Sequence, residues 1–370
     1  DNDPPPDTWH IYIDNMTSNI RVDLGVTGFL QTGIGSGVNS LTLVNASHFP
    51  TAGGFNIQIG SETRTVTSVA GNVFTLSAPT AAAHLAGVPV TMSAIILDTN
   101  NHTNAIVVNG DNISAANPGA KDDLFLVDFS FGNPIPTNGL TVNGLGQVGA
   151  DALQVIDNSN STFNTVTYNS TAFDSGNIVY DLGTQFTLNY TGLEPISDET
   201  NANNRVFNAP VVGNDNVVLS SSNGHTSISS VLGVSLPSFE SVTARNPNTS
   251  LVVNGNNGTN TFQVTGGDVT FVSTLTINGL NGNDTIDASG WTLPLTINGG
   301  LGGDTISGGS AADTSDGGDG ADSISGNGSS DSLIGGLGND TISGGDGADF
   351  VDGGLDDDSL LGDAGDDLLS

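Results

Sequence analysis

The sequence predicts an all-β protein with almost no helix, in which a C-terminal parallel β-roll follows β-solenoid or β-sandwich modules. Its composition, with 51 Gly, 14 Pro, five Lys plus Arg and two Met, favours strands and turns over helices. Short segments that alternate apolar and polar residues recur along the chain. The chain then closes on nine-residue units that carry Gly and Asp at fixed positions.

Composition and patterning divide the chain into five expected regions. The strand-like runs Trp9–Ile13 and Ile20–Leu24 follow a proline-rich lead. We favour their pairing within the chain, and addition to the sheet edge of a neighbouring subunit is the alternative. The regions are an N-terminal extension (1–37), a small β module (38–92), a β-solenoid or β-sandwich region (93–245), degenerate β-solenoid coils (246–298) and a C-terminal β-roll (299–370).

The small β module contains four strand-like runs separated by short turns. The stretch 53–90, GGFNIQIGSETRTVTSVAGNVFTLSAPTAAAHLAGVPV, resembles a small β module found in large bacterial surface proteins and phage tails. That resemblance implies a spacer or assembly unit rather than a catalytic one.

A looser repeat occupies the middle of the chain. Its strand-like segments end at Asn-Gly, which is a turn signal. The last three segments begin 24 and 20 residues apart, a plausible coil length for a parallel β-solenoid. An antiparallel β-sandwich over 93–245 is the competing prediction. The segments are Ala105–Gly110, Gly139–Gly144, Ser250–Gly255, Thr274–Gly279 and Pro294–Gly299.

Eight consecutive nine-residue units run from Gly299 to Ser370 without a gap. Position one is Gly in every unit. Position eight is apolar in seven units, namely Ile306, Ile324, Leu333, Ile342, Val351, Leu360 and Leu369, and Ser315 is the exception. Position six is always Asp: Asp304, Asp313, Asp322, Asp331, Asp340, Asp349, Asp358 and Asp367.

This pattern resembles the G-G-x-G-x-D-x-U-x signature of the repeats-in-toxin (RTX) family, whose repeats bind calcium in a parallel β-helix. The resemblance implies two units per turn, so that Asp residues 18 apart share a Ca²⁺ site. It implies about six ions between the eight aspartates. Asp284, in the degenerate copy Leu280–Ile286, is a further candidate ligand.

The charge distribution supports this interpretation, because the last cationic side chain is Arg245 and the residues after it include 19 Asp. The eight units carry 16 Asp, and six divalent ions reduce their charge from −16 to about −4. The apolar core is too thin to offset chain entropy of roughly 1–2 kcal/mol per residue. We therefore predict that this segment folds on binding calcium.

Five departures from the repeat predict weaker sites. Ala311, Ser329 and Asp356 replace the Gly at position four, and Asn327 and Asp363 replace the Gly at position two. We do not expect equal affinity at all sites.

Several function classes find no support in the sequence. The chain has no Cys, which excludes disulfides and thiol chemistry. A net charge of −34 opposes binding to nucleic acid, and no apolar run is long enough for membrane insertion. Gly144–Gly149 matches G-x-G-x-x-G without a following helix pattern. Asp122, Asp123 and Glu194 are acid–base candidates by residue type only.

Taken together, these patterns predict a non-enzymatic, calcium-dependent structural protein located outside the cell or on its surface. An S-layer, filament or adhesin subunit fits, with self-association into a larger assembly. The alternative is an accessory and scaffold part of a secreted polysaccharide-active or other RTX enzyme. The array ends at a complete ninth position, so we expect either further residues or a capping neighbour.

Overall fold

The computed structural model describes most of the second half of the chain and separate segments of the first half. It describes residues 161–370 apart from 173–174, 194, 211–213, 231–240 and 269. Before these it describes residues 8–9, 21–23, 27–31, 36–42, 55–59, 62–70, 73–84, 89–94, 106–109, 124–129, 133, 135, 138–144 and 152–157. Every regular element within these residues is a β-strand, which confirms the all-β prediction.

The chain forms two compact units, which we describe separately. The first comprises residues 1–159 and 188–194, and the second comprises residues 160–187 and 195–370. None of the described elements is a helix long and apolar enough to cross a membrane. The five expected region boundaries stay a prediction.

The first unit contains a six-stranded antiparallel sheet in the order β3-β8-β5-β6-β7-β4. Leu41, Ile59, Val66, Phe74 and Leu76 supply buried apolar side chains from this sheet. Its strands are β3 (Thr27–Phe29), β4 (Ser40–Thr42), β5 (Phe55–Ile59), β6 (Glu62–Ala70), β7 (Val73–Leu76) and β8 (Pro89–Ala94).

The same unit contains two sets of parallel strands. In one set β10 pairs with β1 and β12, and in the other β9 pairs with β2 and β11, which also pairs with residues 188–191 of β15. The two N-terminal strands therefore pair within the chain, as favoured. The strands are β1 (Thr8–Trp9), β2 (Arg21–Asp23), β9 (Ile106–Asn109), β10 (Leu124–Asp128), β11 (Leu140–Asn143), β12 (Ala152–Ile156) and β15 (Gln185–Thr191).

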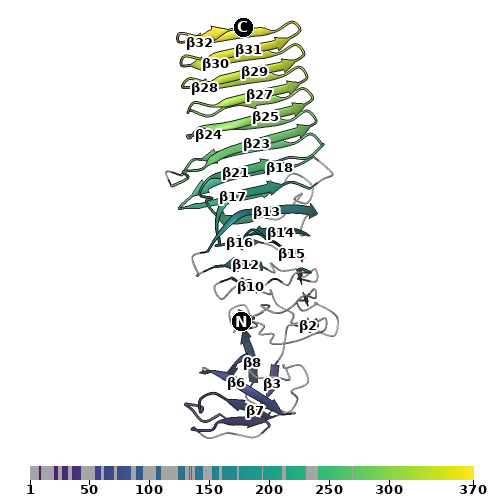
Figure 1. Ribbon diagram of the computed structural model, residues 1–370, viewed down its shortest axis with the longest axis vertical. Helices are drawn as coiled ribbons and strands as arrows, with labels where there is room; N and C mark the ends of the chain where they lie inside the picture. Colours follow the sequence, from purple (N-terminus) through teal and green to yellow (C-terminus); the bar gives the residue numbers. More distant parts are fainter. Residues whose placement is uncertain are drawn as a thin grey trace, which may run out of the picture. The chain divides into compact units, whose positions relative to one another are not determined.

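The second unit is a β-solenoid built from two sheets. One sheet has the order β16-β20-β19-β18-β22-β24-β26-β28-β30-β32, and the other β14-β13-β17-β21-β23-β25-β27-β29-β31-β33. From β21 onward, successive strands alternate between the sheets, so each coil contributes one strand to each. Figure 1 shows these coils stacked one on another from β17 to β32.

The first eleven strands of this unit range from 3 to 11 residues in length. They are β13 (Thr162–Ala172), β14 (Ser175–Asp181), β16 (Ile196–Asp198), β17 (Asn201–Asn208), β18 (Asn216–Ser222), β19 (His225–Ser230), β20 (Val242–Arg245), β21 (Ser250–Asn254), β22 (Thr261–Gly266), β23 (Thr274–Asn281) and β24 (Thr285–Trp291). The remaining strands are β25 (Leu295–Leu301), β26 (Thr305–Ser307), β27 (Thr314–Asp319), β28 (Ser323–Gly328), β29 (Ser332–Leu337), β30 (Thr341–Asp346), β31 (Phe350–Leu355), β32 (Ser359–Ala364) and β33 (Leu368–Leu369).

The coils of the second unit shorten toward the C-terminus. Hydrogen-bonded partners in adjacent coils are 46 residues apart between β17 and β21, 24 between β21 and β23, and 20 between β23 and β25. They are then 18 apart, as two nine-residue units per turn require. The long early coils contain the antiparallel hairpins β13–β14 and β18–β19. Because β13, β17 and β21 pair in parallel, this part of the unit is a solenoid and not a sandwich.

Alternation along each strand places one face in the core. Position-eight side chains form two stacks, one from each sheet. Ile286, Ile306, Ile324 and Ile342 are in register in one sheet, and Ile297, Ser315, Leu333 and Val351 in the other, and all eight are buried. Leu369, in the last strand, is 41% exposed.

Two Asn-Gly dipeptides do not form the turns that the sequence predicted. Asn278-Gly279 and Asn298-Gly299 lie inside β23 and β25. Their side chains hydrogen-bond from coil to coil instead: the Nδ2 atoms of Asn254, Asn278 and Asn298 donate to the Oδ1 atom of the Asn in the preceding coil at 2.6–2.7 Å. This asparagine ladder joins the coils on the outer side of the strands.

A buried polar network in the early coils was not predicted. Asp198 and Arg205 are 0% and 1% exposed. The hydroxyls of Tyr168 and Tyr180 donate to Asp198 Oδ2 at 2.7 and 3.0 Å, and Thr200 donates to Oδ1. Arg205 donates to Arg245 O and Thr200 O and contacts Tyr168. Because each charge has several partners, the network fixes these coils without an unpaired buried charge.

Ser315 offers a test of the core. Its side chain is fully buried in register between Ile297 and Leu333, and its hydroxyl has no hydrogen-bond partner. Ser315→Val should raise the free energy of unfolding of the calcium-saturated chain by about 1–2 kcal/mol, because it removes an unsatisfied hydroxyl and fills the apolar stack. Chemical denaturation in excess calcium measures this change.

Ser323→Val is the matched control, because Ser323 is exposed on β28. Its effect should stay within about 0.5 kcal/mol. A loss of stability in Ser315→Val alone would show that the stack has no room for a larger side chain.

Candidate metal centre

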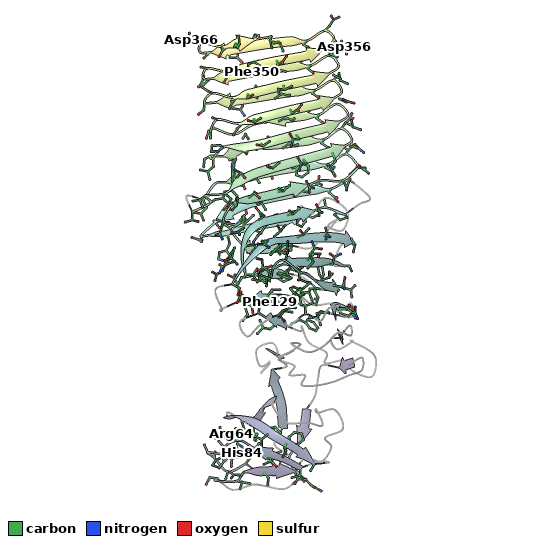
Figure 2. The ribbon with its side chains drawn as sticks, in the orientation of Figure 1. Arg64, His84, Phe129, Phe350, Asp356 and Asp366 are labelled. Atoms are coloured by element: carbon green, nitrogen blue, oxygen red, sulfur yellow. The ribbon has the colours of Figure 1, made fainter. Side chains whose placement is uncertain are left out.

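The position-six aspartates form two columns along the solenoid. Column one comprises Asp284, Asp304, Asp322, Asp340 and Asp358. Column two comprises Asp313, Asp331, Asp349 and Asp367. Asp356 and Asp366, which lie in the last loops of columns one and two, are at opposite edges of the coils in Figure 2. The register between coils thus places aspartates 18 residues apart next to each other, as predicted. It also separates the aspartates into two columns, one at each edge of the coils.

One oxygen of each carboxylate is used within the protein. The backbone N–H of Asp284 donates to Asp304 Oδ1 at 2.7 Å, and that of Asp304 donates to Asp322 Oδ1 at 2.7 Å. The same bond recurs along column one to Asp358 and along column two to Asp367. Each Asp therefore joins its own coil to the preceding one through its Oδ1 atom.

The second oxygen is buried without a donor in six aspartates. The Oδ2 atoms of Asp284, Asp304, Asp322, Asp331, Asp340 and Asp349 have no hydrogen-bond partner, and these residues are 1–3% exposed. A buried carboxylate oxygen without a partner is costly. Such atoms indicate that each carboxylate needs a cation beside it.

The position-one glycines line the same places. A Cβ added to Gly299 would clash with Asp304 Oδ2 and with the carbonyl oxygen of Gly317 in the next coil. The corresponding pair recurs at Gly279, Gly317, Gly326, Gly335 and Gly344. Each place therefore gathers a carboxylate oxygen and a backbone carbonyl, which are hard oxygen ligands of the kind that Ca²⁺ prefers.

Close backbone contact between loops explains the other two glycines of the repeat. Gly300 and Gly302 have φ values of 118° and 121°, and a Cβ on either would clash with the carbonyl of Leu280 or Gly282 in the preceding coil. Only Gly adopts this backbone without strain. Four of the five predicted departures, Asn327, Ser329, Asp356 and Asp363, hold the strained positive φ with a side chain attached.

The fifth departure changes the site itself. In the loop that contains Ala311, the backbone N–H of Gly309 donates to Asp313 Oδ2 at 2.6 Å. The oxygen that is free in the other buried aspartates thus already has a donor at Asp313. Asp358 and Asp367, in the last coil, are only half-buried, and their loops have no following coil among the described residues.

Burial raises the pKa of these carboxyls. The pKa of Asp331 rises to about 7, and those of Asp304 and Asp322 rise to about 6, because desolvation disfavours the charged form and neighbouring aspartates add repulsion. Burial also raises the pKa of Asp284, Asp313 and Asp340. Without a cation, the carboxyl of Asp331 therefore takes up a proton near pH 7, and those of Asp304 and Asp322 do so near pH 6.

Carboxylates alone do not make these sites. In the part of the chain that the structure describes, no three His, Asp or Glu side chains gather closely enough to hold a metal ion. The residues fit calcium through one carboxylate oxygen with backbone carbonyls from Gly-rich loops. A bound ion would supply positive charge between coils, and the carboxylates of the aspartates and the backbone carbonyls of the glycines would hold it.

Comparison with known families decides the nature of the array. The model of the RTX calcium-binding nonapeptide repeat (4 copies) matches residues 276–290, 296–324, 307–342, 325–360 and 334–369. The C-terminal region is an array of RTX calcium-binding repeats. The RTX match begins in the degenerate copy around Asp284 and so extends beyond the eight strict units.

Other comparisons identify no close relative. No curated protein matches the chain. The tailspike gp61 of Pseudomonas phage phi297 is 12% identical, with a TM-score of 0.15, over 96% of this chain and 62% of that protein. The Gp54 tailspike of Acinetobacter baumannii bacteriophage AP22, solved with A. baumannii capsular saccharide, is 11% identical, with a TM-score of 0.18, over 98% of this chain and 69% of that protein.

The remaining sequence candidates stay predictions. Asp122, Asp123, Glu194 and residues 145–149 of the glycine motif lie outside the described residues. At the surface of the second unit, His225 Nε2 and Arg245 Nε each lie 3.0 Å from Glu199 Oε2. These hydrogen bonds lower the pKa of Glu199 against the opposing effect of partial burial.

Acid should compete with calcium for the columns. Because the folded-state pKa values lie above the unfolded value of about 3.9, protonation stabilises metal-free coils below about pH 4, and this stabilisation is lost as pH rises through about 6 to 7. The calcium concentration that half-restores β signal in circular dichroism should therefore rise between about pH 7.5 and pH 5.5, about tenfold per pH unit for each proton a site must release. An unchanged midpoint would contradict these assignments.

Asp356 tests the backbone requirement. Its φ is 85° and its side chain is exposed. Asp356→Gly should raise the free energy of unfolding in excess calcium by about 1 kcal/mol, because the left-handed conformation is strained for residues other than Gly. Asp357→Gly removes the same charge at a neighbouring exposed residue and should bring no such gain. Equal gains from both variants would assign the effect to charge.

Proposed function

We propose that this chain is an extracellular or cell-surface structural protein that calcium rigidifies and assembles. The carrying observation is the set of six buried Oδ2 atoms that lack a donor. These atoms recur in successive coils, so that calcium joins coil to coil along the array. Such repetition suits an element that must hold its length rather than a single regulatory site.

The concentration of calcium outside cells supports an extracellular location. Modules that use calcium outside the cell work at about 10⁻⁴–10⁻³ M, far above the range of cytosolic sensors. An array whose coils depend on ions for cohesion is stable where calcium is abundant. With 16 Asp and no Lys or Arg in the strict repeats, the chain is strongly acidic until ions bind. It then becomes compact, which suits folding after export.

Self-association is the further part of the proposal. Calcium lowers the charge that keeps acidic chains apart. Several apolar side chains are exposed on the C-terminal coils, including Leu337, Leu355 and Leu368, which are 46%, 64% and 62% exposed. Neutralised and rigid coils could then pack side by side, as in an S-layer, a filament or an adhesive stalk.

A calcium titration of chelator-treated protein tests the proposal. Far-UV circular dichroism and light scattering should rise together, with midpoints at about 10⁻⁴–10⁻³ M calcium, while magnesium at the same concentration restores little β signal. A β gain with flat scattering would retain the calcium-dependent fold and reject assembly. It would then favour a monomeric stalk or an accessory domain of a secreted enzyme. No β gain would reject the function.

A further inference from the structure

Column one continues beyond its first aspartate, into a coil that carries Asn at the equivalent place. The backbone N–H of Asn260 donates to Asp284 Oδ1 at 2.6 Å, and the N–H of Asp215 donates to Asn260 Oδ1 at 3.3 Å. These are the same coil-to-coil bonds that the aspartates make. Asn260 is fully buried. It therefore occupies position six of an earlier coil, 24 residues before Asp284.

The amide nitrogen of Asn260 stands where later coils have a carboxylate oxygen. A Cβ added to Gly255 would lie 2.9 Å from Asn260 Nδ2 and 2.8 Å from Gly279 O. One coil later, a Cβ added to Gly279 would clash with Asp284 Oδ2 and Gly299 O. The glycine, the carbonyl and the side-chain atom correspond, but the atom is a donor in one coil and an acceptor in the next.

This exchange removes the need for an ion. Asn260 Nδ2 donates to the carbonyl oxygens of Gly258 at 2.9 Å and Asn256 at 3.2 Å. These are the residues two and four before it in the loop, at positions four and two of the repeat. The amide thus satisfies carbonyl groups directly, whereas the Oδ2 atom of Asp284 has no donor.

Column two begins in a similar way. Its first aspartate, Asp313, receives the N–H of Gly309 at Oδ2 and the N–H of Leu295 at Oδ1. From the loop of Asn260, the Nδ2 atom of Asn256 donates to Asp215 Oδ2 at 2.5 Å and to Pro210 O at 2.7 Å, both in the preceding coil. At the N-terminal end of both columns, N–H donors therefore meet the oxygens that later coils leave free.

We propose that Asn260 is a built-in substitute for calcium and marks the boundary between calcium-independent and calcium-dependent coils. The coils before Asp284 are folded without calcium, and the RTX coils fold onto them when ions arrive. This inference rests on the proposed calcium-dependent function. It adds which residue sets the boundary and why.

The packing of the early coils agrees with this boundary. The coil of β21 and β22 and its neighbour bury Phe262, Phe271 and Trp291, and the rings of Phe271 and Trp291 pack edge to face at 5.3 Å. The asparagine ladder joins the same coils through Asn254 and Asn278. The later coils bury one aliphatic side chain per nine residues, and Ser315 even interrupts this stack. Large apolar side chains are thus concentrated in the coils up to Trp291, ahead of the strict nine-residue repeats.

Hydrogen exchange of the full chain in chelator, read by peptide, tests the boundary. In the natural sequence, the amides of β21 and β22 should be protected while those of β28–β31 exchange freely, and calcium should protect both. Asn260→Asp should lower protection of β22 in chelator at least about tenfold, because a buried carboxylate then faces carbonyls without a donor, and calcium should restore it. Asn257→Asp is the matched control, since Asn257 is exposed in the same loop.

A reciprocal variant guards against simple misfolding. Asp284→Asn replaces the first free carboxylate by an amide, so it should extend protection in chelator to β24 and lower the calcium stoichiometry by one ion. Equal exchange of β22 and β28–β31 in chelator would overturn the inference, as would equal behaviour of Asn260→Asp and Asn257→Asp. Failure of calcium to protect β28–β31 in the natural sequence would instead reject the calcium function itself.

Discussion

The C-terminal architecture depends on one constraint: the coils from Asp284 to Asp349 each bury a carboxylate that has donors for only one of its two oxygens. The Oδ1 atom fixes the register through the backbone N–H of the preceding coil, and the Oδ2 atom faces a carbonyl across the position-one glycine. Register and metal affinity therefore come from the same side chain. Removing the Asp would loosen the stack as well as the ion, and enlarging the glycine would fill the place that the ion needs.

Much of this arrangement could be predicted from the sequence because the repeat is local and strictly periodic. A nine-residue period with Gly, Asp and one apolar position specifies the coil length, the inward side chains and the ligands. The different roles of Oδ1 and Oδ2 could not be predicted, because they depend on how adjacent loops stack. The donor at Asp313 could not be predicted from Ala311, because Ser329 departs from the repeat at the same position and Asp331 Oδ2 still has no hydrogen-bond partner.

The early coils resisted prediction for a physical reason. Their strands pair over 39 and 46 residues, so the partners of Asn208 and Asn254 cannot be found from a short period. The network around Asp198 and Arg205 joins residues from five strands, β13, β14, β16, β17 and β20, and nothing in its local sequence distinguishes it. Asn-Gly predicted turns from local preference alone, whereas in β23 and β25 the coil-to-coil ladder of Asn side chains prevails over that preference.

As the coils shorten toward the C-terminus, calcium replaces the cohesion that a larger apolar core provides in the longer coils. Coils of 24 and 20 residues enclose Phe262 and Trp291, whereas a coil of 18 residues has room for little more than Ile or Leu from each strand. The free energy gained from apolar burial, at about 25 cal/mol per Å², is therefore smaller in the shorter coils, and another interaction must hold these coils together. Ions between coils do so without adding volume. The first coil that loses the amide of Asn260 is also the point where coils approach their minimum length, so the metal enters where the hydrophobic core no longer suffices.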